Sequence, residues 1–307
     1  MLIAQRAPLA EPRAPRTSAL NRDQKRAGLR FASPAIVLFV VFTVLPFVGA
    51  LGLSFTDYDV LTPPTWVGFD NFTRVFGDAT FRTSMLNVLY YCLMFVPAMI
   101  VLSLALALAL NRRLPGMGVF RTIFFIPVVS SPVAAATVWT WMLNGHYGPL
   151  NDLLAMVGIQ GPQWLGDSDW AMVSIVLVTL WQGVGWNMLI YLAGLQNVPH
   201  YLYEAAELDG AGRWQSFVHI TWPQLRTTTF FVTTLSLIGA FQLFDQAYVM
   251  TLGGPGQATL TPVLQIYQTA FNRLQMGYAS AQAFCLMLVI VAVTIINMRV
   301  NREEKVT

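Results

Sequence analysis

The sequence predicts an all-α, multi-pass membrane protein with six transmembrane helices and both termini in the cytoplasm. Three observations support this fold class: an apolar composition, six long apolar stretches, and basic residues gathered in alternate connecting segments. The chain has 307 residues, of which 55% are hydrophobic and 11% charged, and its mean hydropathy is +0.55. A soluble domain carries roughly a quarter charged residues. This composition therefore argues strongly against a water-soluble enzyme.

Each of the six apolar stretches is long enough to cross a bilayer, since about 20 helical residues span the hydrocarbon. The predicted spans lie near residues 33–55, 85–110, 119–143, 170–195, 228–251 and 279–298. Four prolines within them predict kinks: Pro46, Pro97, Pro127 and Pro132. The spans together predict one transmembrane domain over residues 31–300. Residues 1–30 are rich in Arg, Pro and Ala and predict a disordered basic tail, and residues 301–307 predict a second cytoplasmic tail.

The distribution of Lys and Arg sets the expected orientation, because cytoplasmic segments carry the excess of these residues. With the N-terminus inside, fifteen of the eighteen basic residues fall in cytoplasmic segments, and only Arg74, Arg82 and Arg273 fall outside. The even number of predicted spans agrees with this orientation. The external segment 56–84 is expected to hold a short helix over residues 68–76, with Asp70 as its N-cap.

The residue types that common catalytic and metal sites need are scarce. Cys92 and Cys285 lie within apolar stretches, and none of the three histidines has a second ligand at metal-binding spacing. The only lysines, Lys25 and Lys305, lie outside any glycine-rich turn, so the phosphate-binding loop G-x-x-x-x-G-K-[ST] is missing. A net charge of +3 does not indicate nucleic-acid binding. The sequence thus predicts a non-catalytic protein that binds no cofactor itself.

The cytoplasmic loop over residues 196–227 carries start and stop signals of helices. Pro199 precedes a helical stretch and Gly210 ends it, where glycine suits a positive φ or a close approach. A second stretch has the spacing of an amphipathic helix, which Pro223 is expected to stop. Its apolar positions are Trp214, Phe217, Val218, Thr221 and Trp222. Periodicity alone allows either an ordered helical loop with a role of its own or a folded surface loop anchored by tryptophans.

This loop resembles the E-A-A-x-x-x-G loop of ABC importer permeases. The match runs from Glu204-Ala205-Ala206 through Asp209-Gly210-Ala211 to Ile220 and Pro223. Trp222 and Arg226 depart from the family's usual residues, but neither lies in the core of the motif. Other stretches resemble the carbohydrate-type permeases of this family, which include those for maltose and glycerol phosphate. They are residues 54–58, 66–72, 244–256 and 267–271.

The resemblance implies a type I importer permease in a bacterial inner membrane. In such importers this loop forms a coupling helix that docks onto a separate ATPase subunit. The residues expected to make that contact are Glu204, Ala205, Ala206, Asp209, Gly210 and Ala211. The implied partners are a second homologous permease subunit, two ATP-binding subunits that hold ATP and Mg, an extracytoplasmic solute-binding protein and the lipid bilayer.

Polar residues in the fourth and fifth stretches predict a solute pathway, because polar groups at membrane depth are costly and are usually functional. They lie beside aromatic residues, and a sugar site needs both kinds of side chain. Gly183 and Gly185 are expected to make the fourth helix flexible. Related permeases also place solute contacts in these two helices. The candidate residues are Gln182, Gly183, Trp186, Asn187, Ser236, Phe241, Gln242, Phe244, Asp245 and Tyr248.

Other interpretations stay open at this point. Gln, Asn and Ser in membrane helices often only bond to a neighbouring helix, and Asp245 can equally bond backbone where its helix ends. The solute can be a mono-, di- or oligosaccharide, or a non-sugar such as glycerol phosphate or its diesters, although no basic residue lies near the pathway to bind a phosphate. An ion-coupled secondary transporter is more remote, since the sequence shows no internal repeat and a single acid within the spans.

Overall fold

The computed structural model describes residues 20–112 and 115–303, and the chain divides into two compact units, residues 1–52 and 53–307. The first unit holds α1 (Leu20–Phe39), the π-helical turn η1 (Val40–Val44) and α2 (Leu45–Leu53). Residues 20–30, which the sequence assigns to the tail, are helical, and the rest of that tail lies outside the described residues. From Arg26 to Leu53 this helix is long and apolar enough to cross a membrane.

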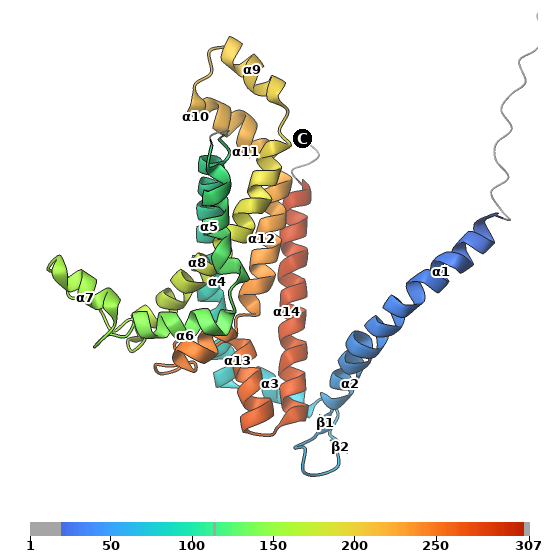
Figure 1. The fold of residues 1–307 in the computed structure, drawn as a ribbon. Coiled ribbons are helices and arrows are strands. Elements are labelled where there is room, and N and C mark those ends of the chain that lie inside the picture. The colour runs from blue at the N-terminus through green and yellow to red at the C-terminus, as the bar shows by residue number, and fades with distance from the viewer. Residues whose placement is uncertain (1–19, 113–114, 304–307) are drawn as a thin grey trace, which may run out of the picture. The chain divides into compact units, whose positions relative to one another are not determined.

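The second unit is built on long helices that lie side by side (Figure 1). α4 (Ala79–Leu110) packs along α8 (Ser168–Gln196) and against α12 (Arg226–Phe241), which in turn contacts α14 (Met276–Glu303). α4 begins before the predicted residue 85 because Asp78 caps it. The Asp78 carboxylate accepts hydrogen bonds from the N–H groups of Thr80 at 2.8 Å and Phe81 at 3.2 Å.

Short elements close one end of this bundle. β1 (Thr56–Asp57) and β2 (Thr65–Trp66) pair antiparallel, with Thr56 opposite Trp66, and α3 (Asp70–Gly77) follows. The turn between the strands is held by Asp59, whose carboxylate accepts from the N–H of Thr62 at 2.8 Å, and this bond lowers the pKa of the carboxyl. α3 confirms the predicted short helix.

The prediction that Asp70 caps α3 is wrong. Phe69 occupies the cap position, and Asp70 is the first residue of the helix. The chain turns at Gly68, where φ is +61°, and the helix starts two residues later. In the first turn Asp70 still interacts favourably with the positive end of the helix dipole.

The span predicted over residues 119–143 is sharply bent, which confirms the kink predicted at Pro132. The chain forms α5 (Met117–Val129) and α6 (Pro132–Met142), whose axes differ by 96°. Pro132 lacks an N–H and disfavours helical backbone in the residue before it, and Ser131 is accordingly extended, with ψ at 129°. The short helix α7 (Pro149–Met156) follows α6.

The span predicted over residues 228–251 is not one continuous helix. α12 ends at Phe241, residues 242–244 are not helical, and a helical segment from Asp245 runs through the π-helical turn η3 (Ala247–Thr251). Gly239, two residues before the end of α12, weakens the helix locally, but no proline or glycine occurs from residue 240 to residue 251 to mark the break itself. Its stabilisation comes from elsewhere: the Thr261 hydroxyl donates to the Leu243 carbonyl at 2.8 Å. α13 (Pro262–Tyr267) and the π-helical turn η4 (Gln268–Asn272) lead to α14.

Four helices of the described residues are long and apolar enough to cross a membrane. They are Arg26–Leu53, Ala79–Leu110, Ser168–Gln196 and Met276–Val300, and the bent pair α5–α6 makes a fifth if it counts as one span. The remaining predicted span is represented by α12, which has only 16 residues. The predicted number of six therefore stays a prediction.

α8 lies at the centre of the packing. It is one continuous helix in which Gly185 serves close packing, and the flexibility that the sequence suggests stays a prediction. A Cβ at Gly185 would lie 2.1 Å from the carbonyl oxygen of Phe124, so α5 can approach α8 only where no side chain intervenes. Gly183 faces α4. A Cβ there would lie 3.1 Å from Cε of Met99, a tight contact with a flexible side chain.

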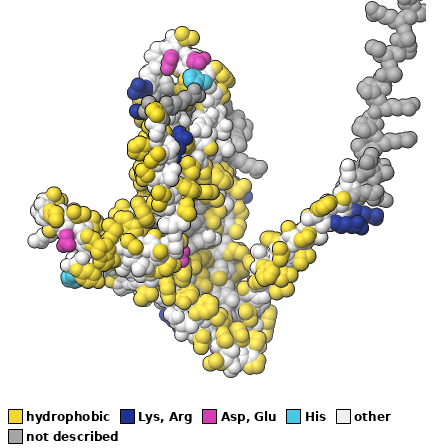
Figure 2. Space-filling view, in the orientation of Figure 1, with side chains coloured by type: hydrophobic (Ala, Val, Ile, Leu, Met, Phe, Trp, Pro, Cys, Tyr) yellow, Lys and Arg dark blue, Asp and Glu magenta, His cyan; other side chains and the backbone are white. Residues whose placement is uncertain are grey.

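The 196–227 loop forms α9 (His200–Leu208), α10 (Arg213–Ser216), the π-helical turn η2 (Phe217–Thr221) and α11 (Trp222–Gln224). The prediction that Pro223 stops the second helix is wrong, because helical backbone continues to Gln224. A π turn ends two residues before Pro223, as η1 does before Pro46, and the wider turn accommodates the proline ring and its missing N–H. Charged side chains gather at this end of the second unit, while hydrophobic ones cover its long helices (Figure 2).

Candidate functional site

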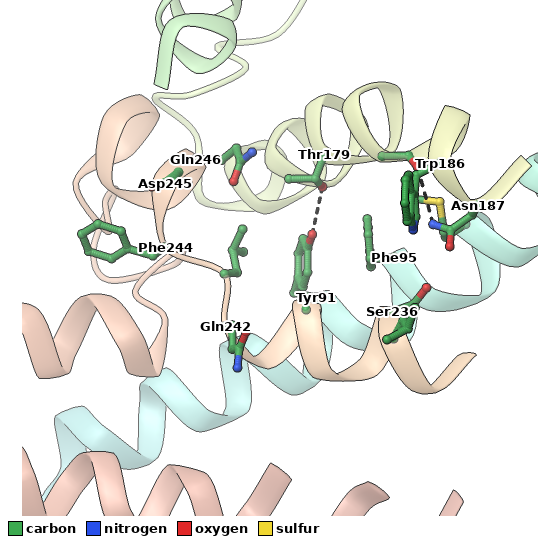
Figure 3. A pocket seen from close by; sticks show the side chains of 15 residues that line it. Tyr91, Phe95, Thr179, Trp186, Asn187, Ser236, Gln242, Phe244, Asp245 and Gln246 are labelled. Carbon is green, nitrogen blue, oxygen red and sulfur yellow. Dashed lines mark hydrogen bonds between the residues drawn. The ribbon is translucent and has the colours of Figure 1, made fainter. Parts of the chain in front are cut away.

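A cavity of about 320 Å³ lies where α4, α8 and the interrupted end of α12 meet (Figure 3). We call it the central cavity. Its lining residues are Tyr91, Phe95, Met99, Thr179, Gly183, Trp186, Asn187, Leu235, Ser236, Gly239, Gln242, Leu243, Phe244, Asp245 and Gln246. Non-helical backbone at membrane depth is tolerated where it lines a cavity, and the unwound segment 242–244 meets that condition.

α4 contributes an aromatic wall to the central cavity. Tyr91 and Phe95 lie one helical turn apart and their rings stack, with centroids 5.1 Å apart and planes 14° apart. The Tyr91 hydroxyl donates a hydrogen bond to Thr179 of α8 at 2.9 Å, which fixes the ring across the cavity (Figure 3). The flat faces of such rings suit the C–H surface of a ring-shaped solute.

α8 contributes an indole and an amide. Trp186 is 51% exposed although it lies in the middle of the helix, and Asn187 beside it is almost completely buried. Within the described residues the Asn187 amide makes a single hydrogen bond, a long contact of 3.5 Å to the Gly183 carbonyl. Most of its hydrogen-bonding capacity is therefore free for a molecule in the cavity.

α12 and the segment after it contribute a hydroxyl and a carboxylate. Ser236 is buried, and its Oγ has no hydrogen-bond partner among the described residues. Asp245 is the only charged side chain among the described lining residues, and no described group donates a hydrogen bond to it or pairs with it. A buried polar atom without a partner is costly. The buried Ser236 hydroxyl is thus positioned to bind something that the described residues do not supply, and the half-buried Asp245 carboxylate lines the same space.

Seven of the ten residues that the sequence predicts line the central cavity: Gly183, Trp186, Asn187, Ser236, Gln242, Phe244 and Asp245. The other three do not line it. Phe241 is buried in the hydrophobic core. Tyr248 stacks on the lining residue Phe244, with ring centroids 5.3 Å apart, and does not itself line the cavity. Gln182 is the third.

Gln182 links the two helix breaks instead of lining the cavity. Its side-chain oxygen accepts from the Gln246 amide at 2.9 Å, and its own amide donates to the Ser130 carbonyl at 3.4 Å. Ser130 lies at the break between α5 and α6, and Gln246 follows the break after α12. One side chain of α8 therefore holds both interrupted helices.

The contribution of α4 to the cavity is not predicted from the sequence. Tyr91, Phe95 and Met99 follow one another at four-residue intervals and lie on one face of a helix. That spacing could have identified them, but in an otherwise apolar helix it also fits ordinary core packing. Thr179 is missed because its role depends on Tyr91.

The 196–227 loop confirms the predicted helix start at Pro199 and stop at Gly210. Pro199 is the N-cap of α9, and Gly210 has a φ of +77° with no atom within 4 Å of where a Cβ would lie, so its conformation and not a close approach requires glycine. The N–H of Ala211 donates to the Ala206 carbonyl at 2.9 Å, and that of Gly210 to Glu207 at 3.1 Å. These two bonds form a Schellman motif, in which the glycine position is left-handed.

The two faces of α9 differ in exposure. Leu202, Tyr203 and Ala206 are half-buried, and the Tyr203 hydroxyl lies 3.0 Å from the Thr221 hydroxyl of η2. On the opposite face Tyr201 is 66% exposed, Ala205 is exposed and Leu208 is 90% exposed. Glu204, Glu207, Asp209 and Gly210 are also exposed, and Ala211 is half-buried. α9 thus presents an apolar stripe with carboxylates beside it to its surroundings.

No group of three or more His, Cys, Asp or Glu side chains that could hold a metal ion occurs within residues 20–112 and 115–303. The arrangement offers no nucleophile paired with a base among those residues. Its chemistry is that of binding: aromatic faces, one carboxylate, and amide and hydroxyl groups around a space of small-molecule size.

Comparison with known proteins places these features in a family. The family model "Binding-protein-dependent transport system inner membrane component" matches residues 75–305. The chain is 40% identical over 280 residues to the probable ABC transporter permease protein YesP of Bacillus subtilis (strain 168), covering 90% of each chain. It is 36% identical over 295 residues to the lactose transport system permease protein LacF of Rhizobium radiobacter, covering 94% of this chain and 98% of LacF.

A solved structure has the same fold. It is the crystal structure of a bacterial alginate ABC transporter in complex with an alginate pentasaccharide-bound periplasmic protein. One of its chains matches with a TM-score of 0.82 at 22% identity, covering 94% of this chain and 99% of that one.

Proposed function

This chain belongs to the family of binding-protein-dependent transport system inner membrane components, and we propose that it is the permease subunit of an ATP-driven importer of a sugar. The central cavity carries the proposal. It combines stacked aromatic rings, the Asn187 amide with one long hydrogen bond, the unpaired Ser236 hydroxyl and a single carboxylate, and no Lys or Arg occurs among its described lining residues. Hydroxyl-rich, uncharged solutes match this set.

The substrate class is a mono-, di- or oligosaccharide or a derivative of one. Lactose and alginate are the solutes named for two of the similar proteins, and they support a carbohydrate here. A phosphorylated solute such as glycerol phosphate would call for Arg or Lys in the cavity, and we regard it as the alternative that the experiment below must exclude.

The energy source is proposed to lie on two separate ATP-binding subunits, which hold ATP and Mg. α9 supports this assignment, because its exposed apolar stripe of Tyr201, Ala205 and Leu208 has the i, i+4, i+7 spacing by which a helix seats in a groove. The Schellman stop at Gly210 keeps the helix end in one conformation. An ordered helix can transmit the closure of an ATPase to the bundle behind it.

The proposed orientation places the 196–227 loop and both termini in the cytoplasm of a bacterial cell, with six spans crossing the inner membrane. The end of the bundle with α9 also carries the residues from the end of α4 to the start of α5, with Arg112 and Arg121. Arg74 and the Gln275 side chain to which it donates lie at the opposite end, beside α3. Basic residues therefore favour the α9 end as the cytoplasmic one.

Two further partners follow from the geometry. Trp186 and Gln242 are exposed although they line the central cavity, so this chain supplies only part of a closed pathway. A second, homologous permease subunit would supply the rest. A solute-binding protein would deliver the sugar at the end opposite α9, as the periplasmic protein named in the alginate structure suggests.

The experiment that tests the proposal starts from the partner solute-binding protein. Its ligands are identified by thermal-shift screening, and the assembled transporter is then reconstituted and assayed for uptake of the best ligand. We expect a sugar, ATP-dependent uptake, and a KM at least fivefold higher for the Asn187→Leu variant. Tight binding of a sugar phosphate would point to the alternative solute class. Uptake by this chain alone, driven by an ion gradient, would overturn the importer assignment.

A further inference from the structure

A second cavity, of about 590 Å³, lies at the end of the bundle that carries α9. We call it the basic cavity. Its described lining residues are Asn111 and Arg112 directly after α4, Arg121 of α5, residues at and after the end of α8, and two residues in the first turn of α9. It shares no lining residue with the central cavity, and the proposed transport function does not use it.

Cationic and hydrogen-bonding groups dominate its lining. Arg112, Arg121 and His200 contribute positive charge or N–H donors, and Asn111, Gln196 and Tyr203 contribute amide and hydroxyl groups. No Asp or Glu occurs among its described lining residues. Of the acids in the described residues, Glu204 pairs with a lining residue: its carboxylate lies 3.3 Å from Nδ1 of His200, and both side chains are exposed.

One of the two arginines is fixed in place. Nη2 of Arg121 donates to the carbonyl of Leu110, the last residue of α4, at 2.8 Å, and its Nε is buried without a partner among the described residues. Arg112 is exposed, and no described acceptor lies within hydrogen-bond distance of it. The guanidinium groups thus retain donors for an incoming anion, and a guanidinium binds phosphate oxygens in pairs.

The start of α9 adds the positive end of a helix dipole. The N-cap is Pro199, which offers no side chain to accept a hydrogen bond, and α9 has nine residues. The N–H groups of His200 and Tyr201 find no acceptor within the described part of the chain. An uncapped helix N-terminus is a favourable position for an anion, and here it opens where the two arginines already lie.

We propose that the basic cavity binds the phosphate group of an anionic ligand, and that this ligand braces α9 against α4, α5 and α8. The shared chemistry fits either the headgroup of an anionic phospholipid or a soluble phosphate. Binding itself does not depend on the proposed function. The consequence of binding rests on the proposed function. If α9 contacts an ATPase, then occupancy of the basic cavity stiffens the contact through which ATP hydrolysis drives uptake.

The test uses the full chain in nanodiscs of phosphatidylcholine, with or without phosphatidylglycerol, followed by native mass spectrometry. We expect wild-type protein to retain phosphatidylglycerol in preference to phosphatidylcholine, and Arg112→Gln to lower that retention about tenfold. Arg299→Gln is the matched control, because Arg299 is exposed at the same end of the bundle but does not line the cavity. Arg121→Gln provides a second variant, accompanied by a melting curve because it removes the bond to Leu110.

A second arm distinguishes the two sources of phosphate. Inorganic phosphate is titrated into protein held in pure phosphatidylcholine, and binding is followed calorimetrically. Binding that Arg112→Gln abolishes assigns the cavity to a soluble phosphate, whereas lipid retention without such binding assigns it to the phospholipid headgroup. Equal retention of both lipids together with no phosphate binding, or an equal loss in Arg112→Gln and Arg299→Gln, would overturn the proposal.

Discussion

The central cavity and the 196–227 loop both lie where helices are interrupted, but different hydrogen bonds hold them. In the loop, the partners are near neighbours: Ala211 bonds to Ala206, and the helix end closes on itself. At the cavity the partners are far apart, as in the bond between Gln246 and Gln182, 64 positions away. The loop is therefore a local structure carried by the bundle, while the cavity is a product of the bundle.

This difference predicts two kinds of mutational effect. Changes in the loop should alter what α9 contacts and leave the bundle folded. Changes at the residues that join the cavity's helices should alter folding stability and transport together. The substitutions below test that separation, from the largest expected effect to the smallest.

Replacing Gly185 with Leu should prevent the bundle from folding. Even the Cβ would lie 2.1 Å from the Phe124 carbonyl oxygen, and backbone cannot move aside as a side chain can. Overpacking in a tight core costs about 1–3 kcal/mol and more where backbone must shift. We expect loss of monodisperse protein in detergent, measured by fluorescence-detected size-exclusion chromatography.

Gly239→Ala is the matched control for that experiment. Gly239 lies in α12, and a Cβ there meets nothing within 4 Å. This variant should elute like wild type. If Gly185→Leu did so too, the close approach of α5 to α8 would not be required for the fold.

Replacing Gly210 with Leu should abolish most transport while the protein stays folded. At a φ of +77° a side chain costs roughly 1–2 kcal/mol, enough to displace the end of α9 but not the bundle behind it. We expect uptake to fall at least tenfold in the assembled transporter, with ATP hydrolysis persisting and an unchanged melting temperature. Gly210→Asn, which tolerates this backbone region, should recover much of the uptake.

The loop could be predicted from the sequence because its signals are local. Pro199 and Gly210 lie at the helix ends that they predict, and the E-A-A motif runs to the residues of the Schellman stop. The wrong prediction that Pro223 ends the second helix also has a local cause. The π turn just before Pro223 accommodates a proline that a regular α-helix would not.

The cavity could be predicted only in part, because its architecture depends on distant contacts. Polar residues in apolar stretches predict Asn187, Ser236 and Asp245 as part of a solute pathway, and all three line the cavity. Near the break after Phe241 the only proline or glycine is Gly239, two residues earlier, and the Thr261 hydroxyl that donates to the Leu243 carbonyl comes from another segment. The long helices themselves were predictable, because apolar length alone defines them.

Replacing Gln182 with Leu should lower thermal stability without removing a cavity-lining group. The substitution leaves the Gln246 amide and the Ser130 carbonyl without their partner, and interhelical hydrogen bonds in membrane proteins are worth about 0.6–1.7 kcal/mol. We expect a melting temperature a few degrees lower in detergent. A double-mutant cycle with Gln246→Leu should show the two losses to be non-additive. Additive losses would mean that Gln182 does not connect the two helix breaks.

Replacing Ser236 with Ala should have the smallest effect and the most specific one. The Ser236 hydroxyl is buried and unpaired among the described residues, so its removal costs the fold nothing and the melting temperature should stay the same or rise slightly. If the hydroxyl bonds the solute, the KM for uptake should rise about fivefold, the equivalent of roughly 1 kcal/mol for one lost hydrogen bond.

Thr233→Val is the matched control for Ser236→Ala. Thr233 lies on the same helix outside the cavity lining, and its hydroxyl is already bonded to the Thr229 carbonyl at 2.7 Å. This variant should leave the KM unchanged. An unchanged KM in Ser236→Ala would separate the unpaired hydroxyl from solute binding, whereas a raised KM together with a stable fold is a combination that a purely structural serine cannot produce.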